Sequence, residues 1–175
     1  MPRAFAKPTP LPQPVRTFSP HGGQAVDLAL KTHLSSAYVE IHRLREWIGH
    51  LADVAGMAPA DLFDLRIAAI EAFIHIIEEA YEGDQHGVVK ATLLLRGGEV
   101  RLVLRDYGRK LSASVEEDAC VPGAGGANLF LIRRLVDEVK FHTSMPRGTA
   151  IEILKRFDRQ PAAEPGRRFR GDRKS

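Results

Sequence analysis

Cysteine is nearly absent from this chain, which has one, Cys120, among 175 residues. A single thiol excludes a disulfide framework and a cysteine-rich zinc module. Long hydrophobic runs are also missing: nowhere do about 18 uncharged apolar residues follow one another, which argues against a transmembrane helix. The N-terminal run MPRAFAKPTPLPQPVRTF lacks the apolar stretch of a secretory signal. These absences predict a cytoplasmic protein that does not use a membrane.

Acidic residues are missing from the first 23 residues, which carry a charge of +3, and basic residues dominate residues 156–175, which carry +4. The formal net charge of the whole chain is +3, so residues 24–155 between these ends carry −4. No basic face accompanies a recognition helix, and we do not expect nucleic-acid binding as the main role. The six prolines of the first segment indicate an extended arm. We expect a proline-rich disordered arm at 1–23, one domain at 24–156 and a basic disordered tail at 157–175.

Hydrophobic periodicity predicts two long helices in the first half of the domain. Apolar residues recur at steps of three and four over 38–55, after the candidate N-cap residues Ser35 and Ser36 and before Gly56, a typical helix end. The next helix begins at proline and runs over 59–81. It is apolar on nearly all sides, which predicts burial between layers.

Five segments are typical of β-strands, and one more is typical of a helix. The expected strands are 24–31, 88–95, 100–105, 139–143 and 149–154, and the expected third helix is 127–137. A Gly-Gly turn joins the second and third strands, which predicts a hairpin. The fold class is therefore α+β, a two-layer sandwich in which helices cover one face of a mixed, mostly antiparallel sheet. Residues 107–126 form a loop long enough to indicate a functional lid.

Four features of this domain carry chemistry. Glu71 and His75 are four residues apart on the apolar second helix, so they share one helix face, either as a core pair or as part of a site. Asp106 ends the third strand, ahead of Gly108. Glycines at 123–126 run directly into the third helix, where backbone N–H groups favour phosphate. Gly148 and Thr149 open the last strand. Each feature alone has an ordinary structural explanation.

Together, and in this order, the four features resemble the GHKL (Bergerat) ATPase superfamily, most closely its anti-sigma factor serine-protein kinases. In that family a helix carries E-x-x-x-N, a strand ends in D-x-G, a glycine-rich lid opens a helix, and G-T begins a late strand. The run LFLIRRLVDEVKF at 129–141 is similar to the helix and strand that follow the lid in the anti-sigma kinases. The resemblance covers roughly residues 24–156.

The resemblance implies roles for the residues that would bind the adenine of ATP and for the residue that would start the phosphoryl transfer. Glu71 would be the general base that takes the proton of an attacking hydroxyl. Asp106 would accept a hydrogen bond from the adenine amino group of ATP. Gly108 would let the strand end pass under the base, and Thr149 would support the adenine contact directly or through water. Phosphoryl transfer needs positioning, charge neutralisation and a base, which agrees with this set.

The lid residues would hold the phosphates. The resemblance implies that the amides of Gly125 and Gly126 wrap them, helped by the helix dipole. Asn128 stands where the family has another glycine, and asparagine tolerates left-handed backbone. Leu129 is the last residue of the motif. Lys110, two residues after Gly108 where many members have glycine, is long enough to reach a phosphate. If it does, Lys110→Ala weakens nucleotide binding.

One further departure concerns the metal. The family's asparagine, whose amide oxygen binds Mg²⁺, is His75 here. Magnesium prefers oxygen ligands in near-octahedral geometry, and imidazole is a poor substitute. The sequence thus leaves open whether His75 supports Mg²⁺ with ATP, and catalysis with it.

The function implied is that of a transcription regulator. It would bind ATP, phosphorylate serine on a STAS-domain anti-anti-sigma protein and, in the alternative state, sequester a sigma factor, as a homodimer. A second hypothesis is a catalytically degenerate protein-binding module that keeps the fold and has lost magnesium-dependent kinase activity. The ATPase half of a histidine kinase is a weaker third, because no phospho-accepting helix hairpin precedes residue 24.

Overall fold

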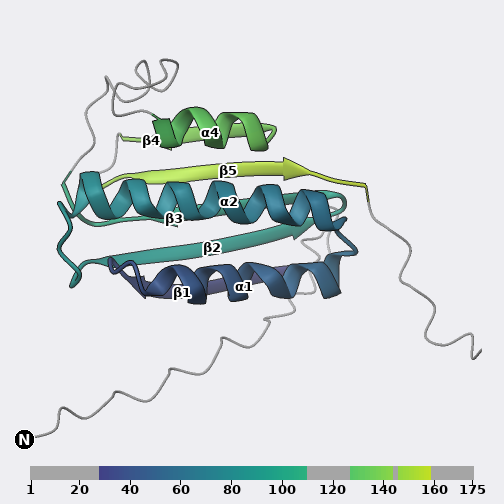
Figure 1. The fold of residues 1–175 in the computed structure, drawn as a ribbon, viewed down its shortest axis with the longest axis horizontal. Helices are drawn as coiled ribbons and strands as arrows, with labels where there is room; N and C mark the ends of the chain where they lie inside the picture. The colour runs from purple at the N-terminus through teal and green to yellow at the C-terminus, as the bar shows by residue number, and fades with distance from the viewer. Residues whose placement is uncertain (1–27, 110–126, 144–145, 159–175) are drawn as a thin grey trace, which may run out of the picture.

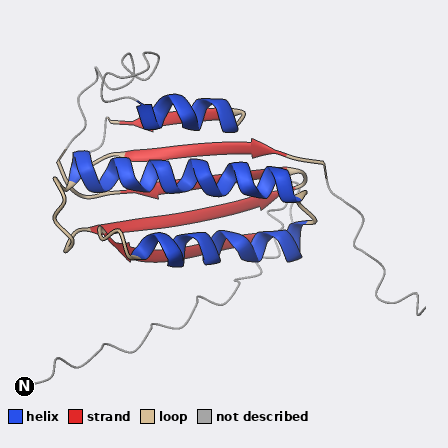
Figure 2. Cartoon of the chain, in the orientation of Figure 1, coloured by secondary structure: helices blue, strands red, loops and turns tan. Residues whose placement is uncertain are grey.

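In the described part of the chain, a five-stranded antiparallel sheet forms one layer and three α-helices form the other (Figure 1). The computed structural model describes residues 28–109, 127–143 and 146–158. The sheet order is β1-β2-β3-β5-β4, and Figure 2 shows the helices on one side of it. The strands are β1 (Leu28–Ser35), β2 (Val88–Arg96), β3 (Glu99–Arg105), β4 (Glu138–His142) and β5 (Ala150–Arg156), and the helices are α1 (Glu40–Ala55), α2 (Pro59–His75) and α4 (Ala127–Leu135). The predicted α+β sandwich is confirmed, and each neighbouring strand pair in this sheet is antiparallel.

At the start of the domain, the bounds of the first strand and the cap of the first helix differ from the prediction. The first strand ends at Ser35, four residues later than expected, and residues 24–27 lie outside the described part. Neither serine caps the first helix: Val39 precedes Glu40, and no side chain caps the helix start. Ser36 is fully buried, and its Oγ donates to the Asp84 carbonyl and accepts from Gly87 N at 2.8 Å. The N-cap prediction was wrong because the Ser36 hydroxyl instead bonds backbone groups of a loop distant in sequence.

The predicted end of α1 and the predicted hairpin are both confirmed by the backbone. Gly56 has φ +64°, the left-handed conformation that ends many helices. Gly97 has φ +55° in the turn between β2 and β3, where Arg96 pairs with Glu99. Side chains alternate along these two strands, so that one face of the sheet is buried against the helices.

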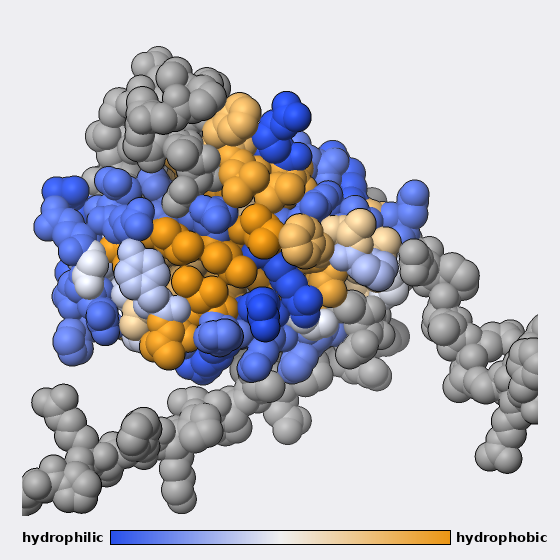
Figure 3. All heavy atoms as spheres, in the orientation of Figure 1, coloured by the Kyte–Doolittle hydropathy of each residue, from blue (hydrophilic) through white to orange (hydrophobic). Residues whose placement is uncertain are grey.

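The central helix α2 is less enclosed than its composition suggests. It continues into η1 (Ile76–Ala80), one turn of π-helix, so the expected helix to residue 81 is confirmed with a widened last turn. One side packs on the sheet, with Leu65 and Phe73 fully buried. The opposite side faces solvent: Phe63 is 62% exposed, and Ile67 and Ile70 are half-buried. The predicted burial between layers was therefore wrong, because no third layer covers the described helices. Figure 3 shows the resulting apolar band on this side.

The second half of the domain matches the prediction to within two residues. Helix α4 ends at Leu135 rather than residue 137, and β4 and β5 follow it with small shifts of their bounds. None of the described helices is long and apolar enough to cross a membrane. Residues 1–23 and 159–175 are outside the described part, so the expected disorder of the arm and tail stays a prediction.

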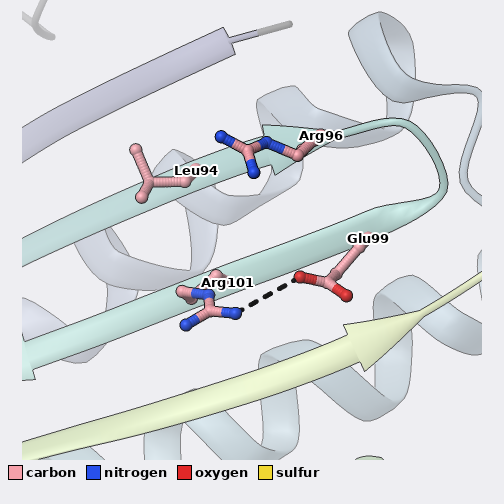
Figure 4. A pocket seen from close by; sticks show the side chains of 4 residues that line it. All are labelled: Leu94, Arg96, Glu99 and Arg101. Atoms are coloured by element: carbon pink, nitrogen blue, oxygen red, sulfur yellow. Dashed lines mark hydrogen bonds and ion pairs between the residues drawn. The ribbon is translucent and has the colours of Figure 1, made fainter. Parts of the chain in front are cut away.

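The sheet face opposite the helices is open and charged. A hollow of about 310 Å³ on this face is lined by Leu94, Arg96, Glu99 and Arg101 (Figure 4). Arg101 lies 3.5 Å from Glu99 and 2.6 Å from a carboxylate oxygen of Glu152. The sheet itself separates this hollow from the helix that carries the predicted Glu71 and His75.

Candidate functional site

Asp106 is the centre of a tight hydrogen-bonded junction at the end of β3. Its side chain is fully buried. One carboxylate oxygen accepts from Gly108 N at 3.0 Å, and the other accepts from Thr149 N at 3.0 Å. The Asp106 N–H donates to the Thr149 carbonyl, also at 3.0 Å. The structure thus brings together three residues that sequence reasoning assigned to one site, although 43 positions separate Asp106 from Thr149.

Glycine is required at two places around this junction. A Cβ on Gly108 would overlap the carbonyl of Ala80, at the end of η1. Gly148 has φ +66°, and a Cβ there would lie 2.6 Å from an Asp106 carboxylate oxygen. Sequence reasoning gave Gly148 a place in the motif but no role. Its role is to let the last strand approach the aspartate.

Burial sets the electrostatics of the junction. It raises the pKa of Asp106, and the N–H groups of Gly108 and Thr149 and the charge of Arg105 act in the opposite direction. Each carboxylate oxygen has a second lone pair beyond the one engaged by backbone. The group is therefore a buried acceptor in which each oxygen keeps one lone pair beyond its hydrogen bond to the backbone.

Tyr81 braces the same end of the molecule, and sequence reasoning missed it. Its hydroxyl donates to the Val88 carbonyl at 2.6 Å and accepts from Tyr107 N at 2.9 Å. The Arg109 N–H donates to the Ala80 carbonyl at 2.8 Å. The end of the central helix is therefore tied to β2 and to the segment after β3. A lone tyrosine after a helix carries no pattern that could have indicated this.

Glu71 and His75 lie on α2, and they do not form the core pair that the sequence left open. No hydrogen bond or ion pair joins them in the described part of the chain. Glu71 is half-buried; burial raises its pKa, and the charge of Glu78 adds to this. A carboxylate that resists ionisation is a stronger base once it is ionised.

His75 is buried with one ring nitrogen unsatisfied. The residue is 4% exposed, and its Nε2 has no hydrogen-bond partner. The ring of Phe141 on β4 meets it edge-on, with centroids 6.5 Å apart and planes at 81°. Burial lowers the pKa of His75, and the charges of Glu79 and Glu78 only partly oppose this. The imidazole is therefore neutral near pH 7.

Some predicted site residues cannot be placed. Lys110, Gly125 and Gly126 lie outside the described residues, as does the side chain of Asn128. Leu129 is buried in the first turn of α4. Among the described residues, no group of three or more histidine, cysteine, aspartate or glutamate side chains could hold a metal ion.

Lys155 on β5 links the N-terminal half of α2 to the end of α4. The sequence did not indicate this contact. The Lys155 ammonium lies 3.0 Å from Asp64, 3.5 Å from Asp61 and 3.0 Å from the carbonyl of Leu135. Burial disfavours the charge, but the hydrogen bond and the charge of Asp64, together with Asp61, outweigh it and raise the pKa of Lys155. The helix that follows the predicted lid is thus held against the helix that carries Glu71.

Comparisons with known proteins agree with this arrangement. Residues 34–155 match the family described as the histidine kinase-like ATPase domain. The chain is 28% identical over 121 residues to the anti-sigma F factor of Anoxybacillus flavithermus, covering 63% of this chain and 82% of that protein. It is 25% identical over 147 residues to the serine-protein kinase RsbW of Listeria monocytogenes, covering 78% and 91%.

A solved structure shares the fold. It contains the RsbU and RsbW domains of Rv1364c from Mycobacterium tuberculosis, and it superposes with a TM-score of 0.57 at 20% identity. The match covers 77% of this chain and 33% of that one, so it spans about a third of the chain in that structure. By the family match, this chain belongs to the histidine kinase-like ATPase domain family.

Proposed function

We propose that this protein binds ATP and phosphorylates a serine on a STAS-type anti-anti-sigma partner, and that it sequesters a sigma factor in the alternative state. The names of its relatives, an anti-sigma F factor and serine-protein kinases, support this class of function. The observation that carries the ATP site is the buried Asp106, held by Gly108 and Thr149 with an acceptor to spare.

Asp106 would read the base of the nucleotide. An adenine offers an amino group, which can donate to a carboxylate oxygen, whereas guanine presents a carbonyl oxygen at the corresponding position. Two acceptors facing each other in a buried site are unfavourable, because neither is satisfied. The proposal therefore includes a preference for ATP over GTP.

Glu71 would act on the hydroxyl of the partner. In the transfer, its carboxylate takes the serine proton, the serine oxygen bonds to the γ-phosphorus, and the bond from that phosphorus to the bridging oxygen of ADP breaks. The raised pKa of Glu71 suits a group that must accept a proton and later release it. Gly125 and Gly126 would supply amides to the phosphates, and Lys110 a positive charge, as the resemblance implies.

Magnesium does not fit the donor at the position where the resemblance expects a ligand. His75 offers a neutral ring nitrogen shielded from solvent, and Mg²⁺ binds oxygen and keeps its waters. We assign no step to Mg²⁺ through this residue.

The kinase proposal is tested by transfer of radiolabelled phosphate from ATP to a STAS-domain protein of the same organism. We expect labelling that disappears when the acceptor serine of the partner is replaced by alanine. Glu71→Gln should slow the transfer by about 10²- to 10⁴-fold and leave ATP binding in place. Glu46→Gln, an exposed glutamate on α1, is the matched control. Transfer that survives Glu71→Gln unchanged would contradict the role of Glu71 as base.

One observation favours a second candidate, the catalytically degenerate binding module. A buried imidazole stands in place of a metal-binding amide, and loss of the metal would end catalysis without affecting a protein interface. Such a protein should bind a sigma factor or a STAS protein equally well with Glu71→Gln, and should transfer no phosphate under any condition.

Homodimer formation and a cytoplasmic location remain predictions from the resemblance and the composition. Sedimentation equilibrium of the full chain, with a monomer mass of 19.4 kDa, would decide the first.

A further inference from the structure

The outward face of the sheet, on the side away from the helices, distributes its charges unevenly. Strands β1 and β2 contain no acidic residue, and their cations are Lys31, Lys90 and Arg96. All three occupy outward positions in the alternating burial pattern of these strands. We call these three residues the basic strip. None of them forms an ion pair within the part of the chain that the structure describes.

The strands beside the basic strip carry carboxylates that are already engaged. Arg101 on β3 lies 2.6 Å from Glu152 on β5. Glu99 faces Arg96 across the hairpin. Its carboxylate oxygens, however, lie 3.5 Å from Arg101 and 3.8 Å from Arg156. Figure 4 shows the contact between Glu99 and Arg101 and none to Arg96. One half of this face therefore neutralises its own charges, and the basic strip does not.

The strand register adds a like charge at one end of the basic strip. Lys90 lies directly opposite Arg105 on β3, and both residues occupy outward positions. Arg105 donates to the carbonyl of Arg147 and lies over the ring of Tyr107, contacts that leave its charge in place. Like charges directly opposite each other destabilise a sheet. An anionic group bound above them would remove this cost.

A hollow lies along the same strand as two of the cations. It has a volume of about 310 Å³ and is lined by Leu94, Arg96, Glu99 and Arg101. Leu94 is half-buried and stands between Lys90 and Arg96 on the outward side of β2. These two cations are six residues apart, which is about 20 Å in a strand. Arginine side chains around an apolar centre are typical of protein–protein interfaces.

Charge complementarity decides which kind of molecule fits the basic strip. The ends of this chain carry +3 over residues 1–23 and +4 over residues 156–175, so neither end complements it. Two copies placed face to face would bring their basic strips together. The helix layer of a second copy is acidic, with five acidic residues and one arginine on α2 and η1. That layer could meet the strip only head to tail, a contact that makes rings or filaments rather than a twofold dimer.

Nucleic acid fits the same face less well than a protein does. Contacts to nucleic acid are mostly made to phosphates, which gain nothing from a hollow lined by leucine. The carboxylates of Glu99, Glu138 and Glu152 also lie on this face and would repel a backbone of phosphates that extends beyond the strip. An acidic protein segment can satisfy the cations and place an apolar side chain in the hollow.

We propose that the outward face of β1 and β2 is a docking surface for a segment of a partner protein that is rich in aspartate and glutamate. Lys31, Lys90 and Arg96 contact its carboxylates, and the hollow at Leu94 receives an apolar side chain. This inference goes beyond the proposed function, because the sheet separates the docking surface from Glu71 on α2. A partner can therefore dock here while the nucleotide site is occupied.

Fluorescence anisotropy tests the proposal with the full chain and a labelled peptide of glutamate with interspersed leucine. Binding should weaken as salt is raised, because exposed charges are screened. Lys31→Glu combined with Lys90→Glu should weaken binding at least about tenfold, because like charges then face each other across the interface. The matched control is Arg133→Glu combined with Arg134→Glu, which makes the same change of net charge at two exposed positions of α4. It should keep the affinity within about threefold.

Two further variants separate charge, hollow and folding. Leu94→Ala should weaken binding of the peptide without changing the charge, and a peptide of glutamate alone should not distinguish this variant from the wild type. Lys31→Gln combined with Lys90→Gln should give a smaller loss than the charge reversal. Urea denaturation of each variant shows that it is folded.

Several results would overturn the inference. These are absence of peptide binding to the wild type at low salt, equal weakening in the strip variant and the α4 control, and unchanged binding in both. A DNA duplex that binds more tightly than the peptide and loses affinity only in the strip variant would identify nucleic acid as the occupant instead. A change of sedimentation mass in the strip variant alone would identify a second copy.

ATP binding distinguishes this inference from the proposed function. The strip variant should bind ATP as the wild type does. Absence of ATP binding in both proteins, with the peptide result as expected, would contradict the proposed ATP site and leave the docking surface standing.

Discussion

The two ends of helix α2 hold polar side chains in opposite ways. At the N-terminal end, Asp61 and Asp64 share the ammonium of Lys155, which also donates to a carbonyl of α4. Toward the C-terminal end, Glu71 has no ion-pair partner among the described residues and a raised pKa, and His75 has an unsatisfied nitrogen and a lowered pKa. Both ends are at least partly buried on the same helix.

The difference between the two ends distinguishes polar groups that stabilise the fold from polar groups that suit a functional site. Where buried charges compensate one another, they fix the position of α4 and need no ligand. Where polar groups are desolvated without compensation, the fold bears a cost that a ligand can relieve, and perturbed groups of this kind cluster at functional sites. The helix thus combines an anchor with a site.

Removal of the anchor should have the largest effect on stability. The side chain of Lys155 is 12% exposed, and Lys155→Met would leave two carboxylates and a carbonyl without their partner. We expect the free energy of unfolding to fall by about 2–3 kcal/mol, below the full cost of breaking a buried pair because the two aspartates are partly exposed. Urea denaturation measures this.

The control for Lys155→Met is an ion pair at the surface. Lys140→Met removes the partner of Glu138, and both of those side chains are about half exposed. Its cost should stay within about 1 kcal/mol. Equal losses in the two variants would contradict the anchoring role of Lys155.

Asp106→Asn should have the next largest effect, on binding. The amide keeps the shape but turns an NH₂ group toward one backbone N–H, and it loses the charge that strengthens the contact to a donor. We expect ATP affinity to fall about 10- to 100-fold, equivalent to about 1.5–3 kcal/mol for hydrogen bonds to a charged group. Calorimetry of the variant against Asp84→Asn, an exposed position, checks this; equal affinities in the two would refute it.

His75→Leu should stabilise the protein, in contrast to Lys155→Met. Leucine removes the unsatisfied nitrogen and fills an apolar surrounding next to Phe141. The expected gain in unfolding free energy is about 1 kcal/mol, the cost of one buried unpaired polar group. A loss of stability larger than this would show that His75 is satisfied in the free protein.

The smallest effect is the pH dependence at Glu71. Its folded pKa is raised, so in the window between the unfolded value of about 4.3 and the folded value the folded state holds more protons, and stability falls as pH rises. Glu71→Gln should therefore raise the free energy of unfolding near pH 7. The gain should stay below about 1 kcal/mol, because solvent screens the charge of a half-buried group, and it should vanish below about pH 4. Lys155 should behave differently, because its raised pKa keeps its stabilisation intact until pH passes about 10.

Denaturation of wild type and Glu71→Gln at several pH values measures this difference. A gain that grows toward acid pH would give the wrong sign and contradict the desolvation of Glu71.

The sequence predicted the features that repeat along the chain. The periodicity of α1 and α2, the Gly-Gly turn and the order of the strand segments were enough for the fold class. The assembly of Asp106, Gly108 and Thr149 followed from a family resemblance, because nothing local links positions so far apart.

Other features depend on partners distant in sequence, and these were missed. Ser36 bonds to the loop before β2 rather than to its own helix, and Lys155 reaches Asp61 and Asp64 from the last strand. The apolar outer side of α2 was taken for a buried one, because composition does not tell how many layers a fold has. Tertiary contacts set each of these positions.

Calorimetric titration of the full chain with ATP and with GTP, each with Mn²⁺ and Mg²⁺ supplied together, tests the central claim most directly. Binding of one ATP per chain, with much weaker binding of GTP, is the predicted result. No heat of binding at millimolar ATP, or equal affinity for the two nucleotides, would contradict the assignment of the Asp106 junction as an adenine site.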